Sequence, residues 1–263
     1  MTTRAHEISV KESSLSDIVR WRDMYRLEMS CQIVHDSIHE RRGWTDEYLL
    51  FVNGAAVGYG SIAVSGPWKG IPTAYEFYVV PQQRLRLFEL FQALLRASGA
   101  VTIEVQSNDV LATTMLHTFA EPVTSESVLF HDKVTTSLRP IGATFREPTS
   151  KEAKDVSRDE LRWHGVVEVD GRVAASGGIL FHYNRPYGDI FMETNESFRR
   201  RGLGAFLVQE LKRVCYEGGH VPAARCNPNN VASRRTLQRA GFVPCGHILK
   251  GPVLIERAQS IPG

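Results

Sequence analysis

The sequence has few cysteines and no long apolar run, and both absences narrow the class of protein. Four cysteines occur in 263 residues, widely spaced and without a C-x-x-C pair: Cys31, Cys215, Cys226 and Cys245. This spacing predicts reduced thiols and argues against a disulfide framework or a zinc site. No stretch of about 18 apolar residues is present, and residues 1–10 lack the apolar centre of a signal peptide. We therefore expect a soluble, cytoplasmic protein that does not contact a membrane.

The chain also lacks an excess of charge of either sign. Its 31 basic and 29 acidic side chains leave a formal net charge of +2. This balance argues against a dedicated nucleic-acid surface but allows a local basic pocket. The histidines show no metal-ligand spacing, so no metal site is expected. With 43% hydrophobic residues, the chain can bury one large core or two modest ones, and its length favours two domains.

Hydrophobic patterning predicts a similar order of elements in each half of the chain. In the first half we expect strands over 8–10, 48–52, 55–64, 73–80, 101–105 and 128–134, and helices over 14–27, 31–42, 85–95 and 110–119. In the second half we expect strands over 163–169, 173–181, 189–194, 223–226 and 242–254, and helices over 205–216 and 231–240.

Two pairs of matching positions predict an internal duplication. The turns Asn53-Gly54 and Asp170-Gly171 are separated by nearly the same offset as Arg84 and Arg199. We therefore expect a mixed α/β fold of two tandem domains, each with a mixed, mostly antiparallel sheet flanked by helices. The expected domains are residues 1–138 and 139–263. A linker is expected near residues 135–149, where prolines and a glycine interrupt the periodicity.

One turn in the second half has the chemistry of an anion site. Arg199, Arg200, Arg201, Gly202, Leu203 and Gly204 follow an apolar strand and open an amphipathic helix. The first N–H groups of a helix have no intrahelical partner, and glycines let a phosphate approach the backbone closely. Arginines add charge-assisted contacts. A phosphate-bearing ligand is therefore predicted, against the simpler alternative of a basic surface turn.

The first half differs from the second at the corresponding turn. After Arg84 the chain reads Leu85-Arg86-Leu87-Phe88-Glu89, without a glycine at either equivalent position and with an acidic residue where a phosphate would lie. This difference predicts that the first half has lost its anion site.

The strand, the R-x-x-G-x-G turn, the helix, and then Asn230-x-x-Ser233 with Gly241-Phe242 resemble the GNAT superfamily of acyl-CoA-dependent N-acyltransferases. The resemblance in motif covers residues 163–254, and over 1–138 it depends on element order alone. It implies that the pantetheine arm of acetyl-CoA pairs with Met192, Glu193 and Thr194. It also implies that Asn230 and Ser233 flank the thiol, with asparagine capping as a compatible role. The implied pyrophosphate cradle comprises Arg199, Arg200, Arg201, Gly202, Leu203, Gly204 and Ala205, and Arg234 and Arg235 are further phosphate candidates.

The sequence departs from the family pattern at the catalytic positions. Where many members carry a tyrosine that protonates the thiolate, this chain has Leu237. The alternatives are protonation by Tyr183 or Tyr187, or departure of the thiolate into water without a donor. Gly188 stands where many members carry a glutamate base. Glu193 and Asp189 are the carboxylates of the motif strand, and we favour Glu193 as base. An ion pair with a nearby arginine is the structural alternative for Glu193.

The resemblance implies transfer of an acetyl group from acetyl-CoA to a primary amine by direct attack, without a covalent acyl-enzyme. A main-chain N–H near residues 192–194 is expected to hold the oxyanion. The acceptor is expected to be a small-molecule or peptide amine, and the protein a monomer or homodimer. A non-catalytic acyl-CoA-binding or scaffold protein is the alternative, favoured by Leu237 and Gly188. Binding of another nucleotide is a third possibility.

Overall fold

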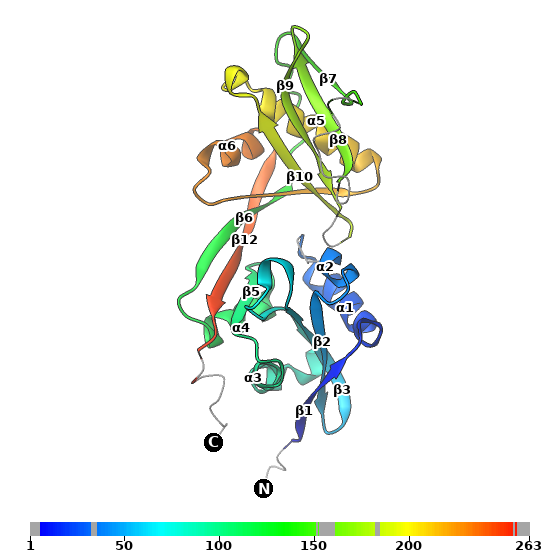
Figure 1. Ribbon diagram of the computed structural model, residues 1–263, viewed down its shortest axis with the longest axis vertical. Helices are drawn as coiled ribbons and strands as arrows, with labels where there is room; N and C mark the ends of the chain where they lie inside the picture. The colour runs from blue at the N-terminus through cyan, green and yellow to red at the C-terminus, as the bar shows by residue number, and fades with distance from the viewer. Residues whose placement is uncertain are drawn as a thin grey trace. The chain divides into compact units, whose positions relative to one another are not determined.

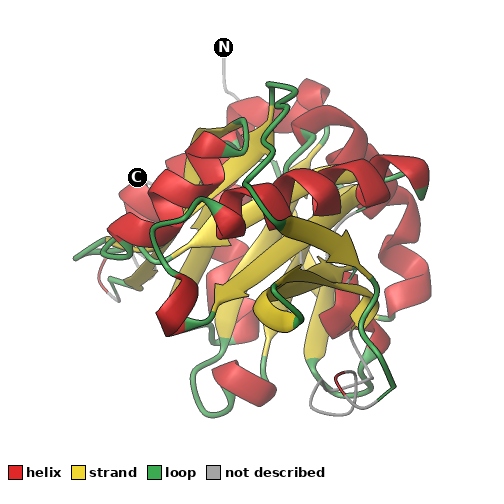
Figure 2. Cartoon of the chain, turned by 90° about the horizontal axis from the view of Figure 1, so that it is seen from above, coloured by secondary structure: helices red, strands yellow, loops and turns green. Residues whose placement is uncertain are grey.

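The computed structural model describes residues 6–32, 36–150, 152, 161–181, 185–254 and 256. Their backbone forms mixed sheets with helices packed against them (Figures 1 and 2). The chain divides into two compact units. The first unit comprises Met1–Cys31, Asp36–Glu126 and His247–Gly263, and the second comprises Gln32–His35 and Ser127–Gly246. Tyr183 lies outside the described residues.

The first unit is a mostly antiparallel sheet with the strand order β1-β2-β3-β4-β5, followed by the last part of β12. Among the described residues of this unit, only β4 and β5 pair in parallel. The strands are β1 (Ile8–Ser13), β2 (Thr45–Val52), β3 (Ala55–Ala63), β4 (Thr73–Val79), β5 (Thr102–Gln106) and β12 (Phe242–Pro252). The helices are α1 (Leu15–Met29), α2 (Asp36–Glu40), η1 (Gly66–Trp68), η2 (Pro81–Arg86), α3 (Leu87–Ser98) and α4 (Val110–Phe119).

The second unit has the strand order β6-β11-β10-β9-β8-β7, again with one parallel pair, β10 and β11. The strands are β6 (Thr124–Asp132), β7 (Ala143–Arg146), β8 (Leu161–Val169), β9 (Arg172–Leu180), β10 (Tyr187–Thr194) and β11 (Val221–Cys226). The helices are η4 (Glu196–Phe198), α5 (Leu203–Glu217) and α6 (Val231–Arg239). The mixed α/β fold expected from the sequence is confirmed.

The contacts divide the chain differently from the expected boundary after residue 138. Strand β6 pairs with β11, which brings residues 127–138 into the second unit. The last part of β12 pairs with β5, which brings residues 247–254 into the first unit. The segment expected as a linker contains β7, whose Phe145 packs on the core of the second unit. A strand of four residues is too short to show a periodic pattern in the sequence.

Equivalent local structures recur in the two units. Both hairpins turn through left-handed backbone, at Asn53-Gly54 and at Asp170-Gly171. Arg84 Nε donates to the carbonyl of Val79, 3.0 Å away, and Arg199 Nε donates to the carbonyl of Thr194, 3.4 Å away. In each case the acceptor lies five residues earlier, at the end of a strand. These shared contacts support the alignment of Arg84 with Arg199.

Helix α5 is held in place by its apolar face and by one buried lysine. Leu207, Val208 and Leu211 have no exposed surface, and each such burial contributes roughly 1.5–3 kcal/mol. Lys212 Nζ donates to the carbonyls of Val134 (2.8 Å) and Ala240 (2.7 Å), and lies 2.6 Å from Asp132 Oδ1. The lysine thus ties α5 to the end of α6. In the described part of the chain, no helix is long and apolar enough to cross a membrane.

Candidate functional site

Strands β10 and β11 separate after a short paired segment. Their parallel register covers three pairs only, from Tyr187 and Val221 to Asp189 and Ala223. On its other edge β10 stays paired with β9 as far as Thr194, without a break in register. Beyond Asp189, the edge of β10 that faces β11 therefore has no partner strand in the described chain. Such an edge can hydrogen-bond an extended ligand as an added strand would.

The turn that follows β10 delivers backbone N–H groups to the same place. Asn195 begins it by accepting a hydrogen bond from Ser197 N (3.3 Å). Arg200 and Gly202 both adopt positive φ, 63° and 80°, and α5 begins at the next residue. The first N–H groups of this 15-residue helix have no intrahelical acceptor and carry the positive end of its dipole. The conformation is that of an anion site.

The two glycines of the turn have separate physical roles. A Cβ at Gly204 would lie 2.9 Å from Thr194 Oγ1 and 3.3 Å from Thr236 Cγ2, so only glycine lets α5 start this close to β10 and α6. A Cβ at Gly202 would lie 3.4 Å from the guanidinium of Arg239. A side chain at residue 202 would therefore enter the space that an anion in the turn would occupy.

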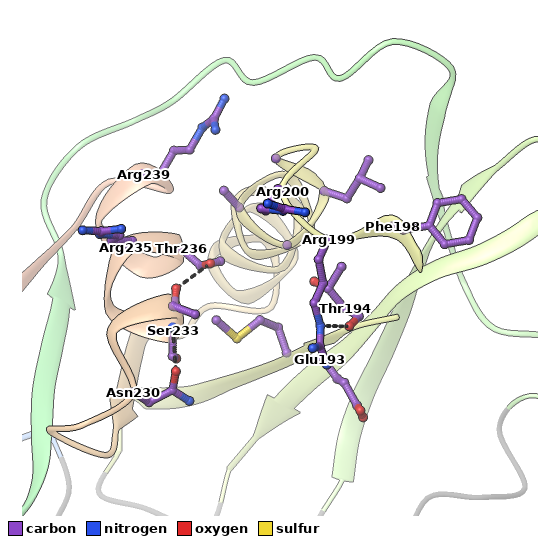
Figure 3. A pocket seen from close by; sticks show the side chains of 16 residues that line it. Glu193, Thr194, Phe198, Arg199, Arg200, Asn230, Ser233, Arg235, Thr236 and Arg239 are labelled. Carbon is purple, nitrogen blue, oxygen red and sulfur yellow. Dashed lines mark hydrogen bonds between the residues drawn. The ribbon is translucent and has the colours of Figure 1, made fainter. Parts of the chain in front are cut away.

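A cavity of about 680 Å³ lies between the end of β10, the turn and α6 (Figure 3). It brings together most of the residues expected from the sequence. The lining contains Met192, Glu193, Thr194, Arg199, Arg200, Gly202, Leu203, Gly204, Ala205, Asn230 and Ser233. It also contains Arg235, Thr236, Arg239, Phe198 and Ala232.

Three expected residues do not line this cavity: Arg201, Arg234 and Tyr187. The guanidinium carbon of Arg201 lies 5.5 Å from the centre of the Phe198 ring, and Arg201 is not part of the lining. Its expected contact with the pyrophosphate is therefore not supported. Tyr187, at the start of β10, is half-buried and also does not line the cavity.

Sequence reasoning missed Thr236 and Arg239 as cavity residues. The available signal was their spacing on α6. Thr236 and Arg239 follow Ser233 and Arg235 by three and four residues, which places them on the same face of a helix. Asn230 caps this helix, since its Oδ1 accepts from Ser233 N at 2.9 Å, so the capping alternative holds together with its place in the cavity.

The two carboxylates of β10 have different environments. Glu193 is exposed and lies beside the turn. Asp189 is only 5% exposed and lies where β10 and β11 begin to separate. Burial raises the pKa of Asp189 to about 7, and the charge of Arg225, whose Nε lies 3.5 Å from Oδ2, partly offsets this effect. Asp189 therefore exchanges its proton near neutral pH, as a general base must.

The structure explains both departures from the family pattern. Leu237 is 1% exposed and belongs to the core cluster of the second unit, so residue 237 points into apolar packing. A Cβ at Gly188 would lie 2.7 Å from Ile179 Cγ2 and 2.9 Å from Cys215 Sγ. A glutamate at residue 188 would therefore collide with the core.

In the first unit, three aromatic rings pack between the elements that correspond to β10, α5 and α6 of the second unit. Phe77 of β4, Phe91 of α3 and Phe119 of α4 are buried, and their ring centres lie 4.7 and 5.5 Å apart in an edge-to-face and a tilted contact. Strand β4 separates from β5 after Ala74, as β10 does from β11.

The first unit also contains a cluster of buried charged side chains that hydrogen-bond to one another. Arg22 donates two hydrogen bonds to Glu76, at 2.9 and 3.0 Å, and the hydroxyl of Tyr59 donates a third at 2.8 Å. His39 bridges Glu76 and Glu47, at 3.2 and 2.8 Å. Burial alone raises the pKa of Glu76, but Arg22 and His39 outweigh it and hold the pKa well below its usual range. These partners satisfy the buried charge, as structural stability requires.

Comparison with known proteins agrees with this geometry. Residues 132–242 match the model of the acetyltransferase (GNAT) family. An acetyltransferase of the GNAT family from Colwellia psychrerythraea superposes with a TM-score of 0.71 at 17% identity, covering 94% of this chain and 100% of that chain. A tandem GNAT protein from the clavulanic acid biosynthesis pathway gives 0.61 at 15% identity, with coverage of 94% and 98%. A GCN5-related N-acetyltransferase from Sphaerobacter thermophilus gives 0.60 at 15% identity, with coverage of 93% and 95%. No curated protein matches the sequence.

Proposed function

Residues 132–242 match the model of the GNAT family of acetyltransferases, and on this premise we propose that the second unit transfers an acetyl group from acetyl-CoA to a primary amine. The family and the fold support acyl transfer in general. The choice of acetyl-CoA and of an amine is our proposal. The single observation that carries it is the cavity in which an open strand edge leads to a phosphate-binding turn.

The residues present fit acetyl-CoA along its length. The glycine-containing turn has room for a pyrophosphate beside Gly202, together with Arg199 and Arg200. The open edge of β10 offers main-chain groups near Met192 and Thr194 to the amide groups of the pantetheine arm. When bound, acetyl-CoA supplies the activated acetyl group, and the protein orients it and manages the proton of the amine.

We propose Asp189 as the group that takes the proton from the attacking amine. Asp189 lies five residues before Thr194, roughly 16 Å along the strand, which is comparable to the reach of an extended pantetheine arm. Its carboxyl therefore lies near the thioester end, whereas Glu193 lies at the phosphate end. The unbroken register of β10 places both on one face of the sheet. Position and the raised pKa thus favour Asp189 over Glu193.

The thiolate requires a proton from elsewhere, since residue 237 lies in the core. Tyr187 belongs to β10, two residues before Asp189, and strand alternation places it on the same face. We propose Tyr187 as the proton donor. The amine acceptor is proposed to be a small molecule or a peptide.

The experiment combines binding and turnover. Acetyl-CoA is titrated into the protein by calorimetry, and free thiol is then measured during incubation with a panel of amines. Binding together with amine-dependent thiol release supports the proposal. Binding without turnover on any amine would favour the non-catalytic acyl-CoA-binding alternative. Gly188 and Leu237 favour this alternative, because neither residue can act as an acid or a base. Displacement of coenzyme A by ATP or NAD at equal concentration would instead indicate a general nucleotide site.

A further inference from the structure

The cavity has more positive charge than its turn supplies. Arg235 and Arg239 of α6 line it together with Arg199 and Arg200, and Figure 3 shows these side chains around its upper part, with Asn230 at the opposite end. Arg199 lies 3.5 Å from a carboxylate oxygen of Glu196. Within the described ranges, no carboxylate forms an ion pair with Arg200, Arg235 or Arg239.

This charge exceeds what one pyrophosphate requires. A pyrophosphate diester carries two negative charges, and the turn already opposes them with Arg199, Arg200 and the N-terminus of α5. Arg235 and Arg239 add two positive charges from a different helix. Arg239 follows Arg235 by four positions, so both side chains project from one face of α6. A second anionic group of nearly two charges would balance them, and a phosphomonoester has that charge at pH 7.

Helix α4 of the first unit provides an internal comparison, because it begins as α6 does. Asp109 caps α4 by accepting from Ala112 N at 2.9 Å. Asn230 caps α6 by accepting from Ser233 N at the same distance. In both cases the acceptor is the cap side chain and the donor lies three residues later. The two helices therefore align residue by residue from these caps.

The aligned positions differ in charge. Thr114 and Thr118 of α4 stand where α6 has Arg235 and Arg239. Both threonine hydroxyls are used within the helix, since each donates to the carbonyl four residues earlier. The arginine pair thus occurs in the unit that keeps the glycines of the turn and the cavity. It does not occur in the unit whose turn, after Arg84, lacks both glycines.

We propose that Arg235 and Arg239 form a subsite for the 3′-phosphomonoester of coenzyme A. The planar guanidinium group suits this role, because it can give two parallel hydrogen bonds to one phosphate. The inference rests on the proposed function, since it assigns a further part of the same cosubstrate to the same cavity. Its consequence is selectivity. The domain accepts acyl groups carried on coenzyme A and discriminates against pantetheine thioesters that lack the 3′-phosphate.

The test compares coenzyme A with 3′-dephospho-coenzyme A, which differ only in this phosphate. Calorimetry on the wild-type chain should give about tenfold to hundredfold tighter binding of coenzyme A, as expected for charge-assisted hydrogen bonds. Arg239→Gln and Arg235→Gln should each reduce this ratio, and the double variant should bring it close to one. Binding of 3′-dephospho-coenzyme A should fall less than binding of coenzyme A in all three variants.

Arg201→Gln is the matched control, because it removes one positive charge from the same turn but outside the cavity lining. It should leave the ratio of the two affinities unchanged, and equal melting temperatures show that each variant is folded. The inference is overturned if the wild type binds both ligands equally, or if the α6 variants weaken both by the same factor. Failure of the wild type to bind either ligand would refute the proposed function and, with it, this subsite.

Discussion

Replacement of Asp189 by asparagine should remove turnover. It should also change the unfolding free energy relative to the wild type, and this difference should be more favourable to the variant at neutral pH than at acid pH. The folded protein holds the Asp189 proton with a pKa of about 7, compared with an ordinary value of 3.8. Since the folded state binds this proton more tightly than the unfolded state, the associated stability is fully present below pH 3.8. It is lost as the pH rises through the interval up to about 7.

The size of this effect follows from the interval. One pKa unit corresponds to about 1.4 kcal/mol, so a shift of about three units amounts to about 4 kcal/mol between pH 4 and pH 8. Asparagine does not titrate. The unfolding free energy of Asp189→Asn minus that of the wild type should therefore rise by about 2 kcal/mol between pH 5 and pH 7. Any constant cost of burying the amide cancels in this comparison.

Urea unfolding of both proteins at pH 5, 6, 7 and 8 measures the difference directly. Glu193→Gln is the control for the loss of a carboxylate, because Glu193 lies on the same face of the same strand but is exposed. Activity should fall by about a hundredfold or more in Asp189→Asn. Wild-type kcat/KM should increase as the pH rises through about 7. A stability difference for Asp189→Asn that does not change with pH would refute the argument.

Three further substitutions test the site and its supports. Gly202→Asp should abolish acetyl-CoA binding in calorimetry while unfolding stays cooperative, because its carboxylate would lie against Arg239; wild-type affinity would contradict the proposed cradle. Leu87→Asp, at the equivalent position of the first unit, should lower the melting temperature and reduce the unfolding free energy by about 3 kcal/mol, because Leu87 is buried in α3 and a buried charge is costly. An unchanged melting temperature would mean that residue 87 is not a core position. Lys212→Met should cost about 3–5 kcal/mol in urea unfolding, because it leaves the buried carboxylate of Asp132 unpaired, and a cost below 1 kcal/mol would show that the ion pair is dispensable.

Local patterns in the sequence were sufficient for most of the fold. Helix α4 was predicted with its observed bounds from the hydrophobic pattern over residues 110–119. The hairpins followed from Asn53-Gly54 and Asp170-Gly171, which supply the left-handed turn. Residues 31–42 were predicted as one helix, whereas the described helix α2 covers only Asp36–Glu40. The pairing of β6 with β11 and of β12 with β5 was not predicted, because two strands that lie about 100 residues apart carry no local sequence pattern for their pairing.

The part of the candidate site whose residues are adjacent in the sequence was predictable. Arg199 to Gly204 form one turn, so their sequence already fixes their neighbourhood. Arg201 lies over the ring of Phe198 and does not line the cavity, and no spacing rule predicts this position. The properties of Asp189 depend on burial and on Arg225, 36 residues later in the chain, so only the tertiary structure shows its raised pKa. The sequence therefore favoured Glu193, the carboxylate next to the motif.

The exchange of strands means that a cut in the chain between residues 133 and 142 does not separate the units. The amino-terminal fragment would keep β6, which is hydrogen-bonded to β11 in the other fragment. The carboxy-terminal fragment would keep β12, which is hydrogen-bonded to β5. Each fragment therefore supplies a strand to the sheet of the other fragment. Neither half of the chain can be expressed alone without leaving an unpaired strand edge exposed.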